Sequence, residues 1–251
     1  MQCTATDLTY HTSRLLSVPH GMFCRHGGHS PAPYNSLNFS YHTGDNEENI
    51  TANRDMARKI LNLFRLYSAQ QVHADKIAII SEDREEQELS GYDALITNQP
   101  GAGLLIQQAD CQAVLLYDYE KRVIAAIHNG WKGSVVNIIG KTISCLQKHF
   151  QVKPENLIAV ISPSLGPCCA EFIHYKEELP VWMHRYQVQK NYFDFWTISR
   201  IQLIKAGVTL GRIDSAGLCT QCSHDFFSYR RSRMQGKETG RNGSIIGLPP
   251  S

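Results

Sequence analysis

The chain has 251 residues and a mass of 28.3 kDa, and its 25 Lys and Arg face 23 Asp and Glu, which gives a formal charge of +2. This length buries a full hydrophobic core, so neither a metal nor disulfides are needed for folding alone. The balanced charge argues against a nucleic-acid partner, and eight cysteines are too sparse for a secreted disulfide scaffold.

The sequence shows neither a membrane span nor a signal peptide. A membrane helix needs about 18 consecutive apolar residues, and no such window occurs. The segment from Met1 to Leu16 carries polar residues where a signal peptide needs an apolar stretch. We therefore expect a cytoplasmic protein without a membrane partner, whose cysteines are thiols or metal ligands. Since repeats and low-complexity linkers are missing, a single domain over residues 1–251 is expected.

The N-terminal third predicts a loop followed by an amphipathic helix. Residues 21–34 are rich in Gly, Pro and Ser, which indicates irregular structure. A helical pattern starts after Asp45, with Glu47 and Glu48 in the first turn, where the helix dipole favours acidic side chains. Its apolar face consists of Ile50, Ala57, Ile60, Leu61 and Phe64.

From residue 76 onward, short apolar runs predict the strands of a sheet. Turn sequences at 98–101 and 118–122 separate some of these runs, whose short lengths indicate strands buried on both faces. The predicted strands are 77–80, 94–96, 103–106, 113–117 and 123–127.

The C-terminal half predicts two helices and two further strands. The helices are expected over 133–150 and over 197–205, the second ended by Gly207. The strands are expected over 157–161 and 226–229. Together the elements predict a mixed α/β fold with one core.

Three residues expected at strand ends form a candidate metal site: His73, Cys111 and His128. Gaps of 38 and 17 residues are too wide for a zinc finger, but they suit a site assembled where several strands end. Two imidazoles and a thiolate suit a catalytic zinc, which leaves its fourth position for water or substrate. From the residues alone, Cys111 and His128 are equally acceptable as a nucleophile and its base.

A series of short motifs surrounds these residues and runs almost the length of the chain. They are CRHGGHS at 24–30, PYNSLN at 33–38, HTGD at 42–45, QVH at 71–73, ADC at 109–111, HNGWKG at 128–133, GPCC at 166–169, FFSYRR at 226–231 and TGR at 239–241. In this order they resemble the signatures of the YfiH family, also called laccase-domain or polyphenol-oxidase-like proteins.

The resemblance implies a layered α/β/β/α fold with mixed sheets and a zinc ion held by His73, Cys111 and His128. It also implies purine nucleoside phosphorylase activity on adenosine, inosine and methylthioadenosine, accompanied by adenosine deaminase activity. The chain departs from the family pattern just before Arg25, where Phe-Cys replaces a Ser or Thr pair, and at Gln108, which replaces a Thr. These departures bear on the substrate range more than on the metal.

Four residues are candidates for contacts with the substrates. Phosphorolysis needs an anchored phosphate, and we expect Arg25 to hold it, because a planar guanidinium matches phosphate bidentately and the surrounding glycines let the backbone approach an anion. Asn38 and His42 are expected to reach the ribose or the base. Gln71, two residues before His73, is expected to share its strand face and to line the pocket.

Other reactions remain open at the same residues. Deamination would need a water activated at the metal, with Asp110 or Asp45 as proton carrier. The runner-up function is amide hydrolysis of peptidoglycan precursors, either by zinc and water or by Cys111 with His128 as its base. A copper-dependent polyphenol oxidase is a weaker alternative, because none of the eleven histidines forms the His-x-His pair that multicopper oxidases use. A closed, non-catalytic metal module is a third class.

The remaining cysteines leave a second metal site undecided. Cys219 and Cys222 have the spacing of half a zinc knuckle. The candidate other half, Cys168 and Cys169, consists of adjacent cysteines, which rarely share one tetrahedral ion. The arginines at 230 and 231 are expected at a strand end, most simply as a solvated edge. The oligomeric state stays open.

Overall fold

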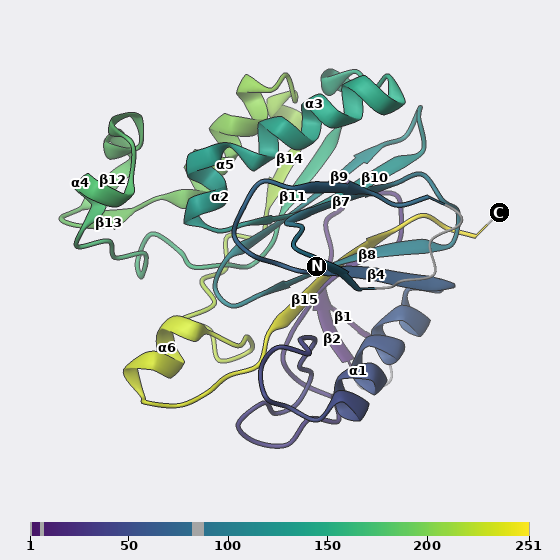
Figure 1. The fold of residues 1–251 in the computed structure, drawn as a ribbon, viewed down its shortest axis with the longest axis horizontal. Helices are drawn as coiled ribbons and strands as arrows, with labels where there is room; N and C mark the ends of the chain where they lie inside the picture. Colours follow the sequence, from purple (N-terminus) through teal and green to yellow (C-terminus); the bar gives the residue numbers. More distant parts are fainter. Residues whose placement is uncertain (1, 6–7, 82–87, 251) are drawn as a thin grey trace.

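The computed structural model describes residues 2–5, 8–81 and 88–250. Two mixed β-sheets lie face to face, and helices cover their outer sides (Figure 1). Helices α3 and α5 lie over one sheet, and α1 lies over the other. The expected α/β/β/α layering with mixed sheets is confirmed.

The first sheet has seven strands within the described residues. In spatial order they are β1 (Gln2–Ala5), β2 (Leu8–His11), β3 (His20–Phe23), β15 (Asn242–Gly247), β8 (Ala102–Gln108), β4 (Arg65–Gln70) and β6 (Glu88–Ser90). Neighbours are antiparallel except around β4, which runs parallel to β8 and β6. Strand β3 includes the first three residues of the segment 21–34, which the sequence predicts as a loop. The loop prediction is therefore wrong for these three residues.

The second sheet has six strands in the part of the chain that the structure describes, and it carries most of the predicted strands. Their order is β14 (Ile213–Ser215), β11 (Ile158–Ile161), β9 (Gln112–Asp118), β10 (Val123–Asn129), β7 (Ala94–Thr97) and β5 (Ile77–Ile79). Strands β7, β9 and β10 are buried on both faces, as their apolar runs predict. Strand β5 lies at the sheet edge and Ile79 is exposed, so the prediction of two-sided burial is wrong there.

The core fills the layers on either side of this second sheet. Along β9, Leu115 packs between the two sheets, whereas its neighbours Val114 and Leu116 pack under the helices. Ile143 of α3 (Ile138–Phe150) and Leu203 of α5 (Phe195–Lys205) cover that outer face.

Helix α1 (Glu47–Ile60) confirms the first predicted helix. The side chain of Asn46 caps it by accepting a hydrogen bond from the amide of Glu48 at 2.7 Å. Ala57 and Leu61 pack against the seven-stranded sheet. Because the helix ends at Ile60, Phe64 lies beyond it and is 68% exposed, contrary to expectation.

The helix predicted over 133–150 is two helices. Helix α2 (Trp131–Val136) ends at Asn137, which adopts a left-handed conformation with φ of 55° and then caps α3 by accepting from the amide of Gly140. This break matters for the site because α2 begins directly after the strand that carries His128. The helix predicted over 197–205 is α5, capped by Asp194.

The strand predicted over 226–229 is wrong. Ser228 caps a short helix, α6 (Tyr229–Met234), by accepting from the amide of Arg231 at 3.1 Å. Arg230 therefore lies in the first turn of a helix rather than at a solvated sheet edge.

A small lobe projects beside the sheets (Figure 1). It contains α4 (Tyr175–Glu178), a 3-10 helix at Val181–Tyr186 and the hairpin of β12 (Gln187–Gln189) and β13 (Tyr192–Phe193), around its own apolar cluster. Further 3-10 turns lie at Pro154–Asn156 and Leu210–Arg212. In the described part of the chain, no helix combines the length and apolar character needed to cross a bilayer.

Candidate metal centre and pocket

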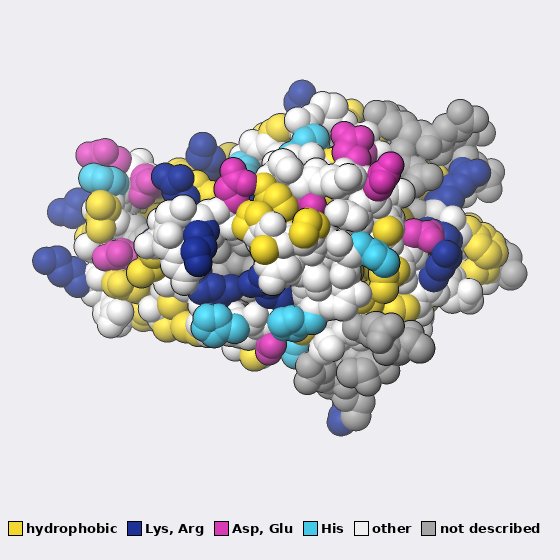
Figure 2. Space-filling view, turned by 90° about the horizontal axis from the view of Figure 1, so that it is seen from below, with side chains coloured by type: hydrophobic (Ala, Val, Ile, Leu, Met, Phe, Trp, Pro, Cys, Tyr) yellow, Lys and Arg dark blue, Asp and Glu magenta, His cyan; other side chains and the backbone are white. Residues whose placement is uncertain are grey.

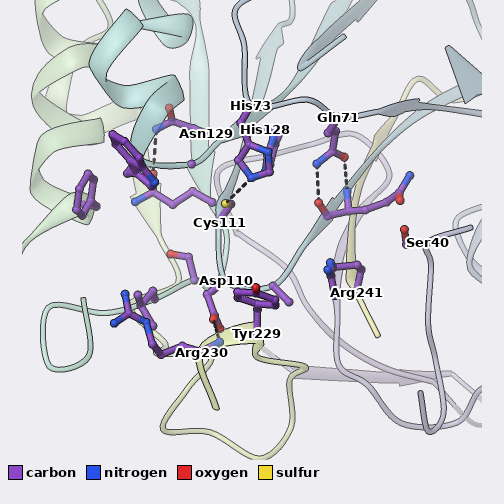
Figure 3. A pocket seen from close by; sticks show the side chains of 18 of the residues that line it. Ser40, Gln71, His73, Asp110, Cys111, His128, Asn129, Tyr229, Arg230 and Arg241 are labelled. Atoms are coloured by element: carbon purple, nitrogen blue, oxygen red, sulfur yellow. Dashed lines mark hydrogen bonds between the residues drawn. The ribbon is translucent and has the colours of Figure 1, made fainter. Parts of the chain in front are cut away.

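The three predicted metal ligands meet at one end of the six-stranded sheet. Ligand atoms of His73, Cys111 and His128 all lie within 4.8 Å of one another. His128 lies near the end of β10, and Cys111 directly precedes the antiparallel neighbour β9, so the two residues emerge at the same sheet edge. Figure 3 shows the sulfur of Cys111 turned toward the histidine rings, with its Sγ 3.7 Å from Nε2 of His73.

His73 reaches this place from a loop rather than a strand. Strand β4 ends at Gln70, and His73 has a left-handed backbone with φ of 59°. The expectation that Gln71 and His73 share a strand face is therefore wrong. Gln71 still lines the pocket, because its side chain acts as a strand partner for Gln107: its Nε2 donates to the carbonyl at 2.7 Å and its Oε1 accepts from the amide at 2.9 Å.

Asp93, which the sequence analysis missed, holds two of the ligands in place. Its buried carboxylate accepts a hydrogen bond from Nδ1 of His128 at 2.8 Å and from the backbone amide of His73 at 2.9 Å. The amide of Ala74 also donates to it, at 2.8 Å. Since Nδ1 of His128 is engaged, Nε2 is the nitrogen free to bind a metal.

The electrostatics favour a thiolate at the centre of this cluster. Burial alone would raise the pKa of Cys111, but the charge of His128 and hydrogen bonds with both histidines bring it down to about 6. Burial opposes charge on His128, yet the thiolate of Cys111 and the carboxylate of Asp93 raise its pKa to about 9. The thiolate is the form in which cysteine binds metals or attacks substrates.

The backbone at Gly130 passes close to the candidate ligands. A Cβ atom at Gly130 would lie 2.8 Å from the sulfur of Cys111 and 3.3 Å from Cδ2 of His73. Only glycine therefore fits here without displacing a ligand. Two imidazoles and a thiolate that line a pocket match a metal site with three protein ligands and a free position.

We expect Asp93→Asn to weaken metal binding about 10–100-fold, the range found when a partner that orients a metal ligand is lost. An amide offers its NH₂ group where the carboxylate accepts backbone hydrogens, so the His73 loop and the ring of His128 lose their fixed orientation. Competition with a chromogenic chelator measures the change in affinity.

Asp75→Asn is the matched control for this variant. Asp75 lies two residues from His73, but it is half exposed and pairs with Lys141 on α3. We expect it to leave metal affinity unchanged. Equal affinities for the two variants would show that Asp93 does not orient the ligands.

The candidate metal ligands lie in the wall of a pocket of about 590 Å³, a size typical of small-molecule sites. One wall is aromatic: the rings of Trp131 and Phe172 lie 6.2 Å apart, and Phe195 lies 5.1 Å from Phe172. A polar wall contains Ser40, Gln71 and Arg241, which Figure 3 shows together, and His42, Tyr229 and Arg230 line the pocket as well.

Arg241, just before β15, brings a positive charge to the polar wall. Burial lowers its pKa, but the charges of Cys111 and Asp110 act in the opposite direction. Among the described residues, no carboxylate forms an ion pair with Arg241, and its Nη1 donates only to the carbonyls of Thr239 and Gly240. Figure 2 views the face on which α6 lies and shows Lys and Arg side chains gathered near its centre. The pocket thus offers an anion-binding group.

Arg25, the predicted phosphate anchor, does not line this pocket. Its Nε and Nη2 donate to the carbonyl of Asn35 at 2.8 and 2.6 Å, and its guanidinium stacks 4.6 Å from the ring centre of Phe227. The guanidinium is thus occupied in holding the loop that was expected to cradle the phosphate.

Of the other two substrate-binding candidates, only His42 lines the pocket. It is half exposed and its Nε2 lies 2.9 Å from Glu88. Asn38 is fully buried, and its Oδ1 accepts from the backbone amide of Arg241 at 2.9 Å. Asn38 therefore positions Arg241 instead of facing the pocket, while its Nδ2 engages Asp45 at 2.9 Å.

Asp110 lines the pocket next to Cys111 with both carboxylate oxygens occupied. One oxygen accepts from the hydroxyl of Thr220 at 2.6 Å and the other from the amide of Arg230 at 2.8 Å. This carboxylate thus ties the start of α6 to the metal site.

Comparisons with known proteins agree with this architecture. The family model described as multi-copper polyphenol oxidoreductase laccase matches residues 19–249. A purine nucleoside phosphorylase of Bacteroides thetaiotaomicron is 32% identical over 234 residues, covering 86% of this chain and 87% of the relative. Purine nucleoside phosphorylase YfiH of Shigella flexneri is 31% identical over 236 residues, covering 89% and 91%. The crystal structure of YlmD from Geobacillus stearothermophilus superposes with a TM-score of 0.88 at 25% identity, covering 99% of this chain and 98% of that one.

Proposed function

The chain belongs to the laccase-domain family, and on this premise we propose that it is a purine nucleoside phosphorylase acting in the pocket beside His73, Cys111 and His128. The observation that carries the proposal is Arg241, a guanidinium without a carboxylate partner among the described residues, in the same pocket as the metal ligands and an aromatic wall. An inorganic phosphate needs a positively charged group such as Arg241, and a purine nucleoside needs an aromatic wall for its base. This pocket has both.

The reaction transfers a ribosyl group from the purine to phosphate. A phosphate oxygen bonds to C1′ as the glycosidic bond breaks, and the bonding electrons pass to the purine, which then gains a proton. Arg241 would hold the phosphate through charge-assisted hydrogen bonds. The purine would pack against Trp131 and Phe172, since aromatic side chains stack on bases irrespective of their substituents. Adenosine, inosine and methylthioadenosine are the proposed substrates.

We propose zinc as the metal held by His73, Cys111 and His128. Zinc would supply a Lewis acid that stabilises developing negative charge at the reacting groups. The same donor set resembles a type-one copper site, but the copper oxidase chemistry in the family's name needs further paired histidines. Among the described residues, no other group of histidines lies close enough to hold a metal.

We also propose a deaminase activity on adenosine in the same pocket. Its water would have to be deprotonated near the metal ligands, and Asp110 is the carboxylate of the pocket lining. Asp45, the other candidate from the sequence, does not line the pocket and is bonded to Asn38. Because both oxygens of Asp110 accept hydrogen bonds, we propose that its first role is to position Arg230.

One observation favours amide hydrolysis as a second candidate function. Cys111, His128 and Asp93 follow one another as nucleophile, base and orienting carboxylate, the order of a catalytic triad. In that reaction water takes the place of phosphate as a substrate, and His73 has no essential part.

The phosphate requirement separates phosphorolysis from hydrolysis of the same glycosidic bond, whereas amide hydrolysis and deamination release no adenine from adenosine. We expect the zinc-loaded protein to release adenine from adenosine only when inorganic phosphate is present, because no other nucleophile is anchored by Arg241. Chromatography of the free base at zero and saturating phosphate measures this. Equal release without phosphate would identify a hydrolase and contradict the phosphorylase proposal.

A further inference from the structure

A second group of sulfur atoms lies outside the pocket. The Sγ atoms of Cys168, Cys169, Cys219 and Cys222 all lie within 4.8 Å of one another. Cys168 and Cys222 are exposed, whereas Cys169 and Cys219 are partly buried. The sequence argued against this grouping because adjacent cysteines rarely share one ion. The fold nevertheless brings all four together.

The spacing of the sulfurs fits a tetrahedron around one ion. Cys222 lies 3.6 Å from Cys168 and 3.4 Å from Cys169, sulfur to sulfur. A zinc–sulfur bond of about 2.3 Å gives a tetrahedron whose sulfurs are separated by about 3.8 Å. A disulfide would need about 2.05 Å. These two distances are close to that separation and far longer than a disulfide bond, so the sulfurs are placed where one small ion could bind them.

A backbone amide donates a hydrogen bond to one of these sulfur atoms. The amide of Gly166 donates a hydrogen bond to Sγ of Cys219 at 3.3 Å. Amide donors of this kind stabilise the negative charge of a metal-bound thiolate.

The two loops that carry the cysteines are fixed to each other. Ser164 and Cys219 form an isolated parallel β-bridge, with the amide of Thr220 donating to the carbonyl of Ser164 at 3.0 Å. On the other loop, the amides of Cys169 and Ala170 both donate to the carbonyl of Gly166, at 2.9 and 3.0 Å. This tight turn lets two adjacent cysteines face the same point.

We propose that Cys168, Cys169, Cys219 and Cys222 bind one zinc ion as a closed tetrathiolate site with a structural role. Four protein ligands leave no position for a substrate, in contrast to the cluster of His73, Cys111 and His128. This proposal stands independently of the reaction in the pocket.

The place of the site explains what such an ion would stabilise. Thr220, within the Cys219–Cys222 turn, donates to Asp110, the neighbour of Cys111 in the pocket wall. On the opposite loop, Ala170 follows Cys169 directly and also lines the pocket. The ion would therefore clamp the pocket-wall segment at Ala170 to the turn that holds Asp110, about fifty residues away in sequence.

The test is the zinc content of the intact protein and its variants, by elemental analysis after purification in a thiol reductant. We expect about two zinc ions per chain in the wild type and about one in Cys111→Ala, which retains the tetrathiolate site. The double variant C168S/C222S, which changes the two exposed cysteines, should also hold about one. Cys145→Ser is the matched control, since this partly buried thiol on α3 belongs to neither cluster, and it should match the wild type.

A spectroscopic measurement on a folded protein keeps the proposal testable if the double variant is unstable. Metal-free Cys111→Ala titrated with Co²⁺ should develop the intense thiolate-to-cobalt absorption of a tetrahedral sulfur site, and one equivalent should raise its melting temperature. A wild type with a single zinc that Cys111→Ala loses completely would overturn the proposal. So would iron in place of zinc, or disulfides among these cysteines in protein purified anaerobically.

Discussion

Cys111→Ala is expected to lose the metal of the pocket and at least about 10³-fold in kcat for phosphorolysis, comparable to the loss of a central catalytic residue. The thiolate lies between two imidazoles within 4.8 Å, so its removal leaves only two ligands for the ion. The measurement combines zinc content, steady-state kinetics with adenosine and phosphate, and the melting temperature.

His73→Ala decides whether this loss comes from the metal or from a nucleophile. A metal centre needs His73 as much as Cys111, so both variants should lose ion and activity together. A cysteine nucleophile would need only His128 and Asp93, and His73→Ala would then keep most of the activity. Cys145→Ala is the control for the loss of a thiol elsewhere. Retained activity in His73→Ala would contradict the metal-centre account.

Arg241→Ala is expected to lower kcat/KM for phosphate about 10²–10³-fold, the usual effect of removing one donor to a developing charge. The side chain lines the pocket without a carboxylate partner among the described residues, so phosphate is the anion that would satisfy it. Arg241→Lys should restore only part of the activity, because an ammonium cannot reproduce the planar guanidinium. Zinc content should not change in either variant.

Two other arginines complete this experiment. Arg212→Ala is the matched control, since Arg212 packs beside Tyr119 and does not line the pocket. Arg25→Ala tests the assignment made from the sequence. Because Arg25 is engaged by Asn35 and Phe227, its loss should lower the melting temperature more than it changes the dependence on phosphate. The opposite pattern, with phosphate dependence lost in Arg25→Ala and kept in Arg241→Ala, would return the anchor to Arg25.

The strands around the candidate metal centre were predictable because the pattern that indicates them lies within short stretches of sequence. Residues 94–96, 113–117 and 123–127 are apolar runs of strand length, and a sheet covered on both faces is the environment that such runs require. Cys111 and His128 adjoin two of these runs, and all three candidate ligands lie within motifs of the family that the sequence resembles. His73, Cys111 and His128 could therefore be proposed together before their distances were known.

Residues that act through long-range contacts could not be found in this way. Asp93 is a single acid before an apolar strand and looks like an ordinary turn residue, and its role appears only when antiparallel pairing places it beside His128. Residues 226–229 have a strand-like composition, but Asn242 supplies the backbone partners of Phe227, accepting from its amide at 2.8 Å and donating to its carbonyl at 2.9 Å. The chain can then turn into α6 instead of extending.

The same reason explains why the sequence predicts Arg25 as the phosphate anchor, whereas the structure leads us to propose Arg241. A glycine-rich loop with an arginine has the composition of an anion site, yet the guanidinium of Arg25 is consumed by the carbonyl of Asn35. Arg241 precedes a short strand that pairs with two others far away in sequence, and the buried side chain of Asn38 holds its backbone amide. Neither contact can be recognised from the residues next to Arg241 in the sequence.

Phosphorus NMR of the reaction between adenosine and inorganic phosphate tests the central claim most directly. The zinc-loaded wild type should convert the phosphate signal into that of ribose 1-phosphate in step with the release of adenine, and Cys111→Ala and Arg241→Ala should leave the phosphate signal unchanged over the same time. Adenine accompanied by free ribose, with the phosphate signal intact, would contradict the assignment of this pocket as a nucleoside phosphorylase.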